Sequence, residues 1–112
     1  MTPPRSEVMP GTLDLLVLKT LDTLGPLHGY AIAERLHQVS RALLEVNQGS
    51  LYPALLRLEH DGAVDSAWGT TENNRKARYY AITKAGRRRL AEEADKWERM
   101  ADVIHRVLDG AF

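Results

Sequence analysis

The chain of 112 residues contains no cysteine. Neither a disulfide nor a thiolate zinc site can support its fold, and this absence fits the reducing cytoplasm. Long apolar runs are missing as well: the opening residues MTPPRSEVMPG do not resemble a signal peptide, and no later segment is apolar for long enough to cross a bilayer. We therefore expect a cytoplasmic protein without a membrane segment.

The sequence also lacks the residue patterns on which enzymes and metal sites depend. It has no paired acid and base, no nucleophile with a nearby histidine, and no glycine-rich phosphate loop between a strand and a helix. The four histidines share no metal-ligand spacing. The sequence thus predicts no enzyme activity, no metal and no cofactor.

A net charge is absent too, because 15 basic residues balance 15 acidic residues. The charges are distributed unevenly, however. Residues 1–69 and 90–112 each carry a net charge of −3, whereas residues 70–89 carry +6. A basic block within a neutral chain is a candidate contact for an anionic partner such as nucleic acid.

What the sequence does contain is helical periodicity, enough for one compact domain and an appendage. Residues 12–24 predict a first helix that stops at Gly25. Leu15 and Leu18 add a second apolar strip, so we expect this helix to be buried on two sides. Residues 28–39 predict a second, shorter helix. Its apolar face is formed by Ile32, Ala33, Leu36 and Val39.

The stretch NQGSLYPALLRLEHDGAV predicts a third helix that ends at Gly62. Two starts are open. Asn47 caps a helix that meets Pro53 several residues in, or Ser50 caps one in which Pro53 falls in the tolerated first turn. Pro53 favours the second start. The buried face consists of Leu51, Ala54, Leu55 and Leu58, and the exposed front near the N-terminus is small and uncharged, so it can approach an anionic backbone closely.

Beyond Gly62 the apolar period changes to that of strands. The segments AVDSAW and ARYYAIT flank the polar stretch GTTENNRK, which predicts a β-hairpin with Tyr80 and Ile82 facing inward. Its tip and returning strand carry the basic residues Arg75, Lys76 and Arg78. Three helices followed by such a hairpin form a winged helix-turn-helix, which we assign to residues 1–86.

Residues 87–112 predict a long helix with the apolar spacing of a coiled coil. A domain this small cannot cover such a face, so we expect a second copy to cover it in a two-fold dimer. The predicted dimer interface consists of Leu90, Ala94, Trp97, Ala101, Ile104 and Leu108. The predicted fold class is therefore mainly α with a small β-hairpin: a winged helix-turn-helix plus a long C-terminal dimerisation helix. Arg87 to Arg89 occupy the first turns of this C-terminal helix, where the helix dipole disfavours cations. Such a local violation has two interpretations: the arginines contact phosphates, or they keep this end of the helix soluble.

The most specific segments are, in chain order, HGYAIAERL, GSLYPALLRLEHDGAV and RKARYYAITKAGRRRL. Together they resemble the PadR family of bacterial transcriptional regulators, in particular its short subgroup with a single C-terminal helix. The resemblance runs from about Gly11 to Leu108. It implies a homodimeric repressor whose third helix, from about Gln48 to Asp61, enters the major groove of DNA while the hairpin lies over the backbone.

Two such helices in a dimer should meet successive major grooves about 34 Å apart, which makes the operator an inverted repeat. The candidate DNA contacts are Gln48, Ser50, Tyr52, Pro53 and Arg57 on the helix and Arg75, Lys76 and Arg78 on the hairpin. Tyr52 has the alternative of packing sideways against the hairpin. The alternative function is a winged-helix protein-interaction module without DNA binding, in which the basic hairpin meets an acidic partner.

Trp97 has two interpretations. A large aromatic side chain on the helix seam packs the dimer core. The resemblance gives the other interpretation: some short members of the family bind planar hydrophobic compounds between subunits, which would make Trp97 a wall of an effector pocket.

Overall fold

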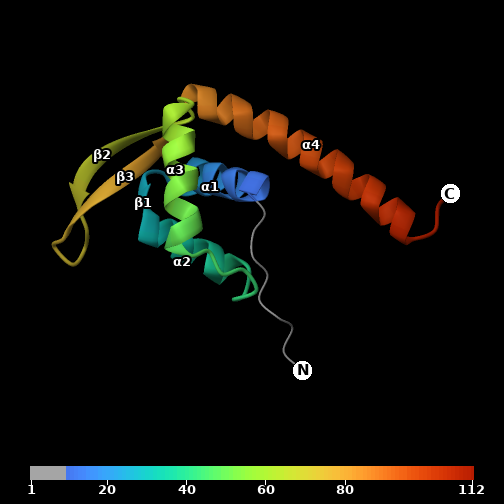
Figure 1. The fold of residues 1–112 in the computed structure, drawn as a ribbon, viewed down its shortest axis with the longest axis horizontal. Helices are drawn as coiled ribbons and strands as arrows, with labels where there is room; N and C mark the ends of the chain where they lie inside the picture. Colours follow the sequence, from blue (N-terminus) through green and yellow to red (C-terminus); the bar gives the residue numbers. More distant parts are fainter. Residues whose placement is uncertain (1–9) are drawn as a thin grey trace.

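The computed structural model describes residues 10–112 of the chain (Figure 1). The elements in chain order are α1 (Pro10–Leu24), β1 (Leu27–His28), α2 (Gly29–Val39), α3 (Gln48–His60), β2 (Val64–Thr70), β3 (Lys76–Ile82) and α4 (Lys84–Leu108). This arrangement confirms the predicted fold class, a mainly helical winged helix-turn-helix followed by a long C-terminal helix. Most of the opening stretch, in which the sequence predicts no signal peptide, lies outside the described residues.

The hydrophobic core forms where α1 meets α2, α3 and the base of α4. Leu18 of α1, Ile32 of α2, Leu55 of α3 and Val64 of β2 are fully buried. Of the second apolar strip, Leu18 is fully buried and Leu15 is partly buried against the core, so this chain itself covers α1 on more than one side. Val39, predicted on the buried face of α2, is instead exposed because it is the last residue of that helix.

The start of α3 corrects the sequence-based prediction. Asn47 and not Ser50 is the N-cap, and its side-chain Oδ1 accepts a hydrogen bond from the Ser50 N–H at 2.9 Å. Pro53 therefore lies in the second turn, where an interior proline costs about 3 kcal/mol. The inner face of α3 carries three fully buried leucines, each of which contributes about 1.5–3 kcal/mol. Tertiary burial thus outweighs the local preference of the proline.

The wing, defined here as β2, β3 and the turn between them, pairs with a strand that the sequence did not reveal. β3 lies between β2 and the two-residue strand β1, where Leu27 is opposite Tyr80 and His28 is opposite Tyr79. Two residues are too few to show an alternating pattern, so only the tertiary structure makes them a strand. Tyr80 is buried and Ile82 packs against the core, as predicted.

The base of α4 is fastened to the junction between α3 and β2. Thr83 is the N-cap: its hydroxyl accepts from the Gly86 N–H at 3.0 Å and donates to the Gly62 carbonyl at 2.6 Å. Gly86 packs so tightly that a Cβ at this position would lie 2.0 Å from the Ala63 carbonyl oxygen. The helix therefore begins at Lys84, earlier than the boundary at residue 87 that the sequence suggested.

Beyond its base, α4 projects away from the rest of the molecule (Figure 1). Leu90, predicted in the dimer interface, is only 7% exposed and belongs to this chain's own core, which corrects that assignment. Its neighbour Arg89 and the preceding Arg87 pair with carboxylates of this chain, which offsets their unfavourable position in the helix dipole. Farther along, the exposed apolar residues of α4 are Trp97, Met100, Val103, Ile104, Val107 and Leu108.

Candidate nucleic-acid interface

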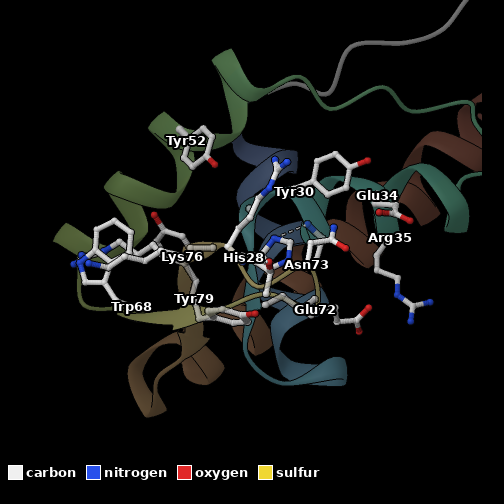
Figure 2. A pocket seen from close by; sticks show the side chains of 18 of the residues that line it. His28, Tyr30, Glu34, Arg35, Tyr52, Trp68, Glu72, Asn73, Lys76 and Tyr79 are labelled. Atoms are coloured by element: carbon white, nitrogen blue, oxygen red, sulfur yellow. Dashed lines mark hydrogen bonds between the residues drawn. The ribbon is translucent and has the colours of Figure 1, made fainter.

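A groove of about 1120 Å³ lies between the start of α2, the first half of α3 and the wing (Figure 2). Its lining is unusually aromatic: Tyr30 comes from α2, Tyr52 from α3, and Trp68 and Tyr79 from the two long strands. The groove therefore brings together the third helix and the basic hairpin that the sequence singled out separately.

Tyr52 is the predicted α3 residue that lines this groove. Its ring lies against the backbone of Gly29 at the start of α2, because a Cβ built on that glycine would be 3.4 Å from the Tyr52 ring and hydroxyl. Tyr52 thus packs toward α2 and remains partly exposed. Gln48, Ser50 and Pro53 are exposed on α3 but lie outside the lining of the groove.

The wing contributes its three predicted basic residues to the groove lining, and two of them surround a tryptophan. Trp68 is directly opposite Arg78 in the β2–β3 register, and the Lys76 ammonium lies 5.0 Å and the Arg78 guanidinium 5.4 Å from the centre of its ring. Cation–π attraction of this kind stabilises an exposed pair by about 0.5–1 kcal/mol. It holds both cations over a side chain that is 61% exposed.

Trp68 is a site residue that the sequence reasoning missed. The segment AVDSAW predicts a strand and gives no separate signal for Trp68, although its position across the hairpin from the basic segment follows from the turn length. His28 and Tyr30 were missed as well, because their place in the groove depends on the pairing of β1 with β3.

Arg78 is also tied to the end of α3. Its Nε donates to the Ser66 hydroxyl at 2.8 Å, its Nη2 lies 3.8 Å from the Glu59 carboxylate, and the Ser66 hydroxyl donates to the same carboxylate. Arg78 is therefore partly neutralised, whereas Arg75 and Lys76 at the wing tip are exposed and form no ion pair with a carboxylate in the described residues.

The electrostatic balance of the groove is basic. Its charged lining consists of Arg35, Arg75, Lys76 and Arg78 against Glu34 and Glu72. Glu34 is engaged with Gln38, which donates to it at 3.3 Å. At the floor, burial raises the pKa of the Tyr80 hydroxyl, and the neighbouring Glu59 carboxylate raises it further, so this tyrosine stays neutral. The groove thus presents cations and aromatic surfaces, a combination suited to an anionic chain.

Arg57 differs from the other candidate contacts, because its side chain points back to α1. Its Nη2 donates to Asp14 Oδ1 at 3.2 Å, and Asp14 Oδ2 accepts from Arg89 at the same distance. The pKa of Arg89 is raised chiefly by its hydrogen bond to Glu93, so this guanidinium remains charged. The predicted contact Arg57 is therefore already paired with a carboxylate of α1, which leaves the front of α3 uncharged as the sequence indicated.

A second hollow, of about 520 Å³, lies between the start of α1 and the middle of α4. Its lining includes Trp97, half exposed, together with Leu15 and Met100. Trp97 therefore borders a concave apolar surface within a single chain.

Metal and membrane features are not found in the part of the chain that the structure describes. No group of three or more histidine and carboxylate side chains is placed to hold a metal ion there. Among the helices of residues 10–112, none combines the length and apolarity that crossing a bilayer requires.

Comparison with known proteins agrees with this geometry. The family model described as Transcriptional regulator PadR-like family matches residues 17–92. A solved transcriptional regulator from Clostridium thermocellum is 29% identical, covers 86% of this chain and 92% of its own, and superposes with a TM-score of 0.78. A PadR family transcriptional regulator from Eggerthella lenta DSM 2243 is 32% identical, with 88% and 82% coverage and a TM-score of 0.75.

A curated relative, uncharacterized protein X from Lysinibacillus sphaericus, is 24% identical over 106 residues, which are 95% of this chain and 96% of that protein. The family match runs from the middle of α1 to the base of α4 and so includes every element around the groove. Members of this family are transcriptional regulators and not enzymes, as the sequence predicted for this chain. The chain belongs to the PadR-like family of transcriptional regulators.

Proposed function

We propose that this regulator is a homodimeric repressor that binds an inverted-repeat operator through α3 and the wing and is released by a planar hydrophobic effector. The observation that carries the proposal is the convergence of Tyr52 with Arg75, Lys76 and Arg78 around one groove. A helix front without charge beside a basic hairpin is complementary to the phosphate backbone. A cytoplasmic location belongs to this proposal because the partner is chromosomal DNA.

The contacts divide between the two elements. Gln48 and Ser50 are exposed in the first turn of α3, where backbone N–H groups and the positive end of the helix dipole also face outward. These residues, with Tyr52 and Pro53, meet bases or phosphates in the major groove. Arg57 can reach a phosphate only by breaking its ion pair with Asp14, so it is a weaker candidate for a DNA contact than the other α3 residues.

On the wing, Arg75, Lys76 and Arg78 contact phosphates or a minor groove, and Trp68 is added as the platform over which two of them lie. Each phosphate contact releases condensed counterions, so operator affinity falls steeply as salt rises. The neutral net charge of the chain does not oppose this, because the field at the groove is local.

The exposed apolar residues of α4 form the proposed dimer seam. They include Trp97, Ile104 and Leu108, flanked by the small residues Ala94 and Ala101 that allow close helix approach. A face of this size in water is otherwise an aggregation hazard. A two-fold pairing of α4 relates the two α3 helices by symmetry, and this is why the operator should be an inverted repeat.

The test of DNA binding is selection of bound fragments from a random-sequence pool, followed by fluorescence anisotropy with the recovered site at two salt concentrations. The proposal requires an inverted repeat, sequence-dependent affinity and weaker binding at higher salt. Absence of binding at low salt would contradict it and favour the alternative, a winged-helix module that binds an acidic protein. A reporter gene placed behind the recovered site separates repression from activation.

The effector part of the proposal is tested at Trp97. A compound seated in the hollow beside this residue contacts α1 and α4 together. In a W68F background, planar aromatic compounds should quench the remaining tryptophan fluorescence, and with the wild-type protein the same compounds should lower operator affinity. If W97A weakens dimerisation while no compound changes the DNA binding of the wild type or of W97A, Trp97 serves only to pack the dimer.

A further inference from the structure

Asp14 on α1 is the buried charged residue of the described chain, with 7% of its surface exposed. Its two carboxylate oxygens hold arginines from two different helices. Oδ1 accepts from Arg57 of α3 and Oδ2 accepts from Arg89 of α4, each at 3.2 Å. One carboxylate therefore joins the helix proposed to enter DNA to the helix proposed to form the dimer.

Arg89 strengthens this connection through its other nitrogens. Its Nη1 lies 3.4 Å from the carboxylate of Asp61, the C-cap residue of α3, and its Nε donates to Glu93 on the next turn of α4 at 2.9 Å. The guanidinium thus contacts α1, α3 and α4 at once. A buried carboxylate is compensated only when its partners keep their geometry, because removal of one partner leaves an uncompensated charge.

We propose that Asp14 is a positioning residue that fixes the angle between α3 and α4 and thereby sets the half-site spacing that the dimer accepts. This inference rests on the proposed function, since it concerns a dimer on an inverted repeat. It assigns Arg57 a role in holding α3 in place, which is distinct from a direct contact with DNA.

The length of α4 makes the spacing sensitive to this angle. Ile104 lies 15 residues beyond Arg89, or about 22 Å along the helix. A rotation of about 10° at the base would displace that part of the seam by about 4 Å relative to α3, which exceeds the rise of about 3.4 Å per base pair. A small change at Asp14 is therefore enough to shift the preferred spacing by one base pair.

The chain offers a matched control. Asp22 of α1 pairs with Arg87 of α4 at 3.6 Å and, like Asp14, connects these two helices at the base of α4. No ion pair or hydrogen bond of the described residues links Asp22 to α3. D22N and D14N both remove one negative charge and one link between α1 and α4, but only D14N removes the link to α3.

The experiment measures the affinity of wild type, D14N and D22N for the site recovered from the random pool and for versions with the half-site spacing changed by one or two base pairs. We expect wild type and D22N to lose at least tenfold in affinity when the spacing changes by one base pair. D14N should bind the best site about five- to tenfold more weakly and discriminate between spacings by threefold or less.

Two outcomes would overturn the inference: unchanged spacing discrimination in D14N, with or without an equal loss of affinity at every spacing, or the same change of discrimination in D22N. R57Q provides a second variant in case D14N does not fold. Removal of a direct phosphate contact lowers affinity equally at all spacings, whereas removal of a positioning contact flattens the spacing profile.

A distance measurement keeps this test independent of DNA. The chain has no cysteine, so Gln48→Cys at the start of α3 can be spin-labelled at a single position per protomer. We expect one narrow distance between the two labels in wild type and D22N, and a clearly broader distribution in D14N. An unchanged distance distribution in D14N overturns the inference even if the wild type binds DNA. If the distances change as expected but none of the proteins binds DNA, only the proposed function is overturned.

Discussion

Leu90 and Leu108 are the same residue type on the same helix, yet Leu90 is 7% exposed and Leu108 is 77% exposed. The base of α4 is stabilised by its N-cap Thr83, by tight packing at Gly86 and by burial of Leu90 in the core. The distal half has instead the surface ion pairs Asp95–Arg99 and Asp102–Arg106.

Each such i,i+4 pair contributes only about 0.3–0.5 kcal/mol, which is too little to keep an isolated helix of this length folded in water. This contrast separates the winged part, which is α1 to β3 together with the base of α4 and has its core covered within one chain, from the distal half of α4, for which we propose a partner. Mutations in the two regions should therefore have different effects. Those in the winged part should unfold the chain, and those in the distal half of α4 should dissociate the proposed dimer.

The largest effect is expected in the winged part. Leu55 of α3 is fully buried, so L55A removes apolar burial and leaves a cavity. We expect the free energy of unfolding to fall by about 2–5 kcal/mol, measured by urea denaturation. L56A is the control, because the neighbouring leucine is exposed and its truncation should change stability by no more than about 0.5 kcal/mol. Equal effects of the two variants would contradict the assignment of the core.

The next effect concerns the distal half of α4. I104D places a charge on the proposed seam, and the dimer dissociation constant should rise at least 100-fold, or about 2.7 kcal/mol. Analytical ultracentrifugation should detect monomers in which the winged part remains folded. E98Q, an exposed change outside the predicted seam, should leave the dimer intact. A wild-type protein that sediments as a monomer would refute the proposed partner.

A smaller effect is expected at the wing. R75Q together with K76Q removes two proposed phosphate contacts from each protomer and should weaken operator binding by about tenfold or more. The slope of the logarithm of affinity against the logarithm of salt concentration should fall by about 0.9 for each phosphate that is no longer neutralised. K19Q on the exposed side of α1 is the control. An unchanged salt slope in the double variant would exclude these residues as phosphate contacts.

The N-cap of α3 should have a modest effect on stability. N47A removes the side chain that accepts the Ser50 N–H and should lower the free energy of unfolding by about 1 kcal/mol. S50A, which removes no capping acceptor, should change it by less than half as much in thermal unfolding. The reverse order would restore Ser50 as the cap.

The smallest effect is expected at alkaline pH. The folded-state pKa of Tyr80 is raised by burial, so the folded state retains this proton where the unfolded state begins to lose it, near pH 10. The stabilisation that the raised pKa of Tyr80 gives to the folded state is complete below that pH and is lost as the pH rises through the folded-state pKa. Y80F should reduce the alkaline loss of stability. The same loss in Y80F and wild type would assign it to other groups.

Much of the fold could be predicted because the pattern of apolar residues is local. The inner face of α3, the hairpin and the inward orientation of Tyr80 all follow from periods of 3.6 and 2 residues. The site was predicted less completely. The basic residues of the wing were identified from charge, but Trp68 and Tyr30 enter the groove through strand pairing, and Arg57 is withdrawn from the front of α3 by a carboxylate 43 positions earlier.

The helices, the hairpin, the basic block and the apolar seam of α4 are all specified by the sequence alone, since each depends on residues near one another in the chain. Tertiary contacts were needed to establish that Leu90 belongs to the core and that Asp14 binds arginines from two helices. These features depend on contacts between distant segments, where burial and charge compensation outweigh the local preferences that a sequence pattern records.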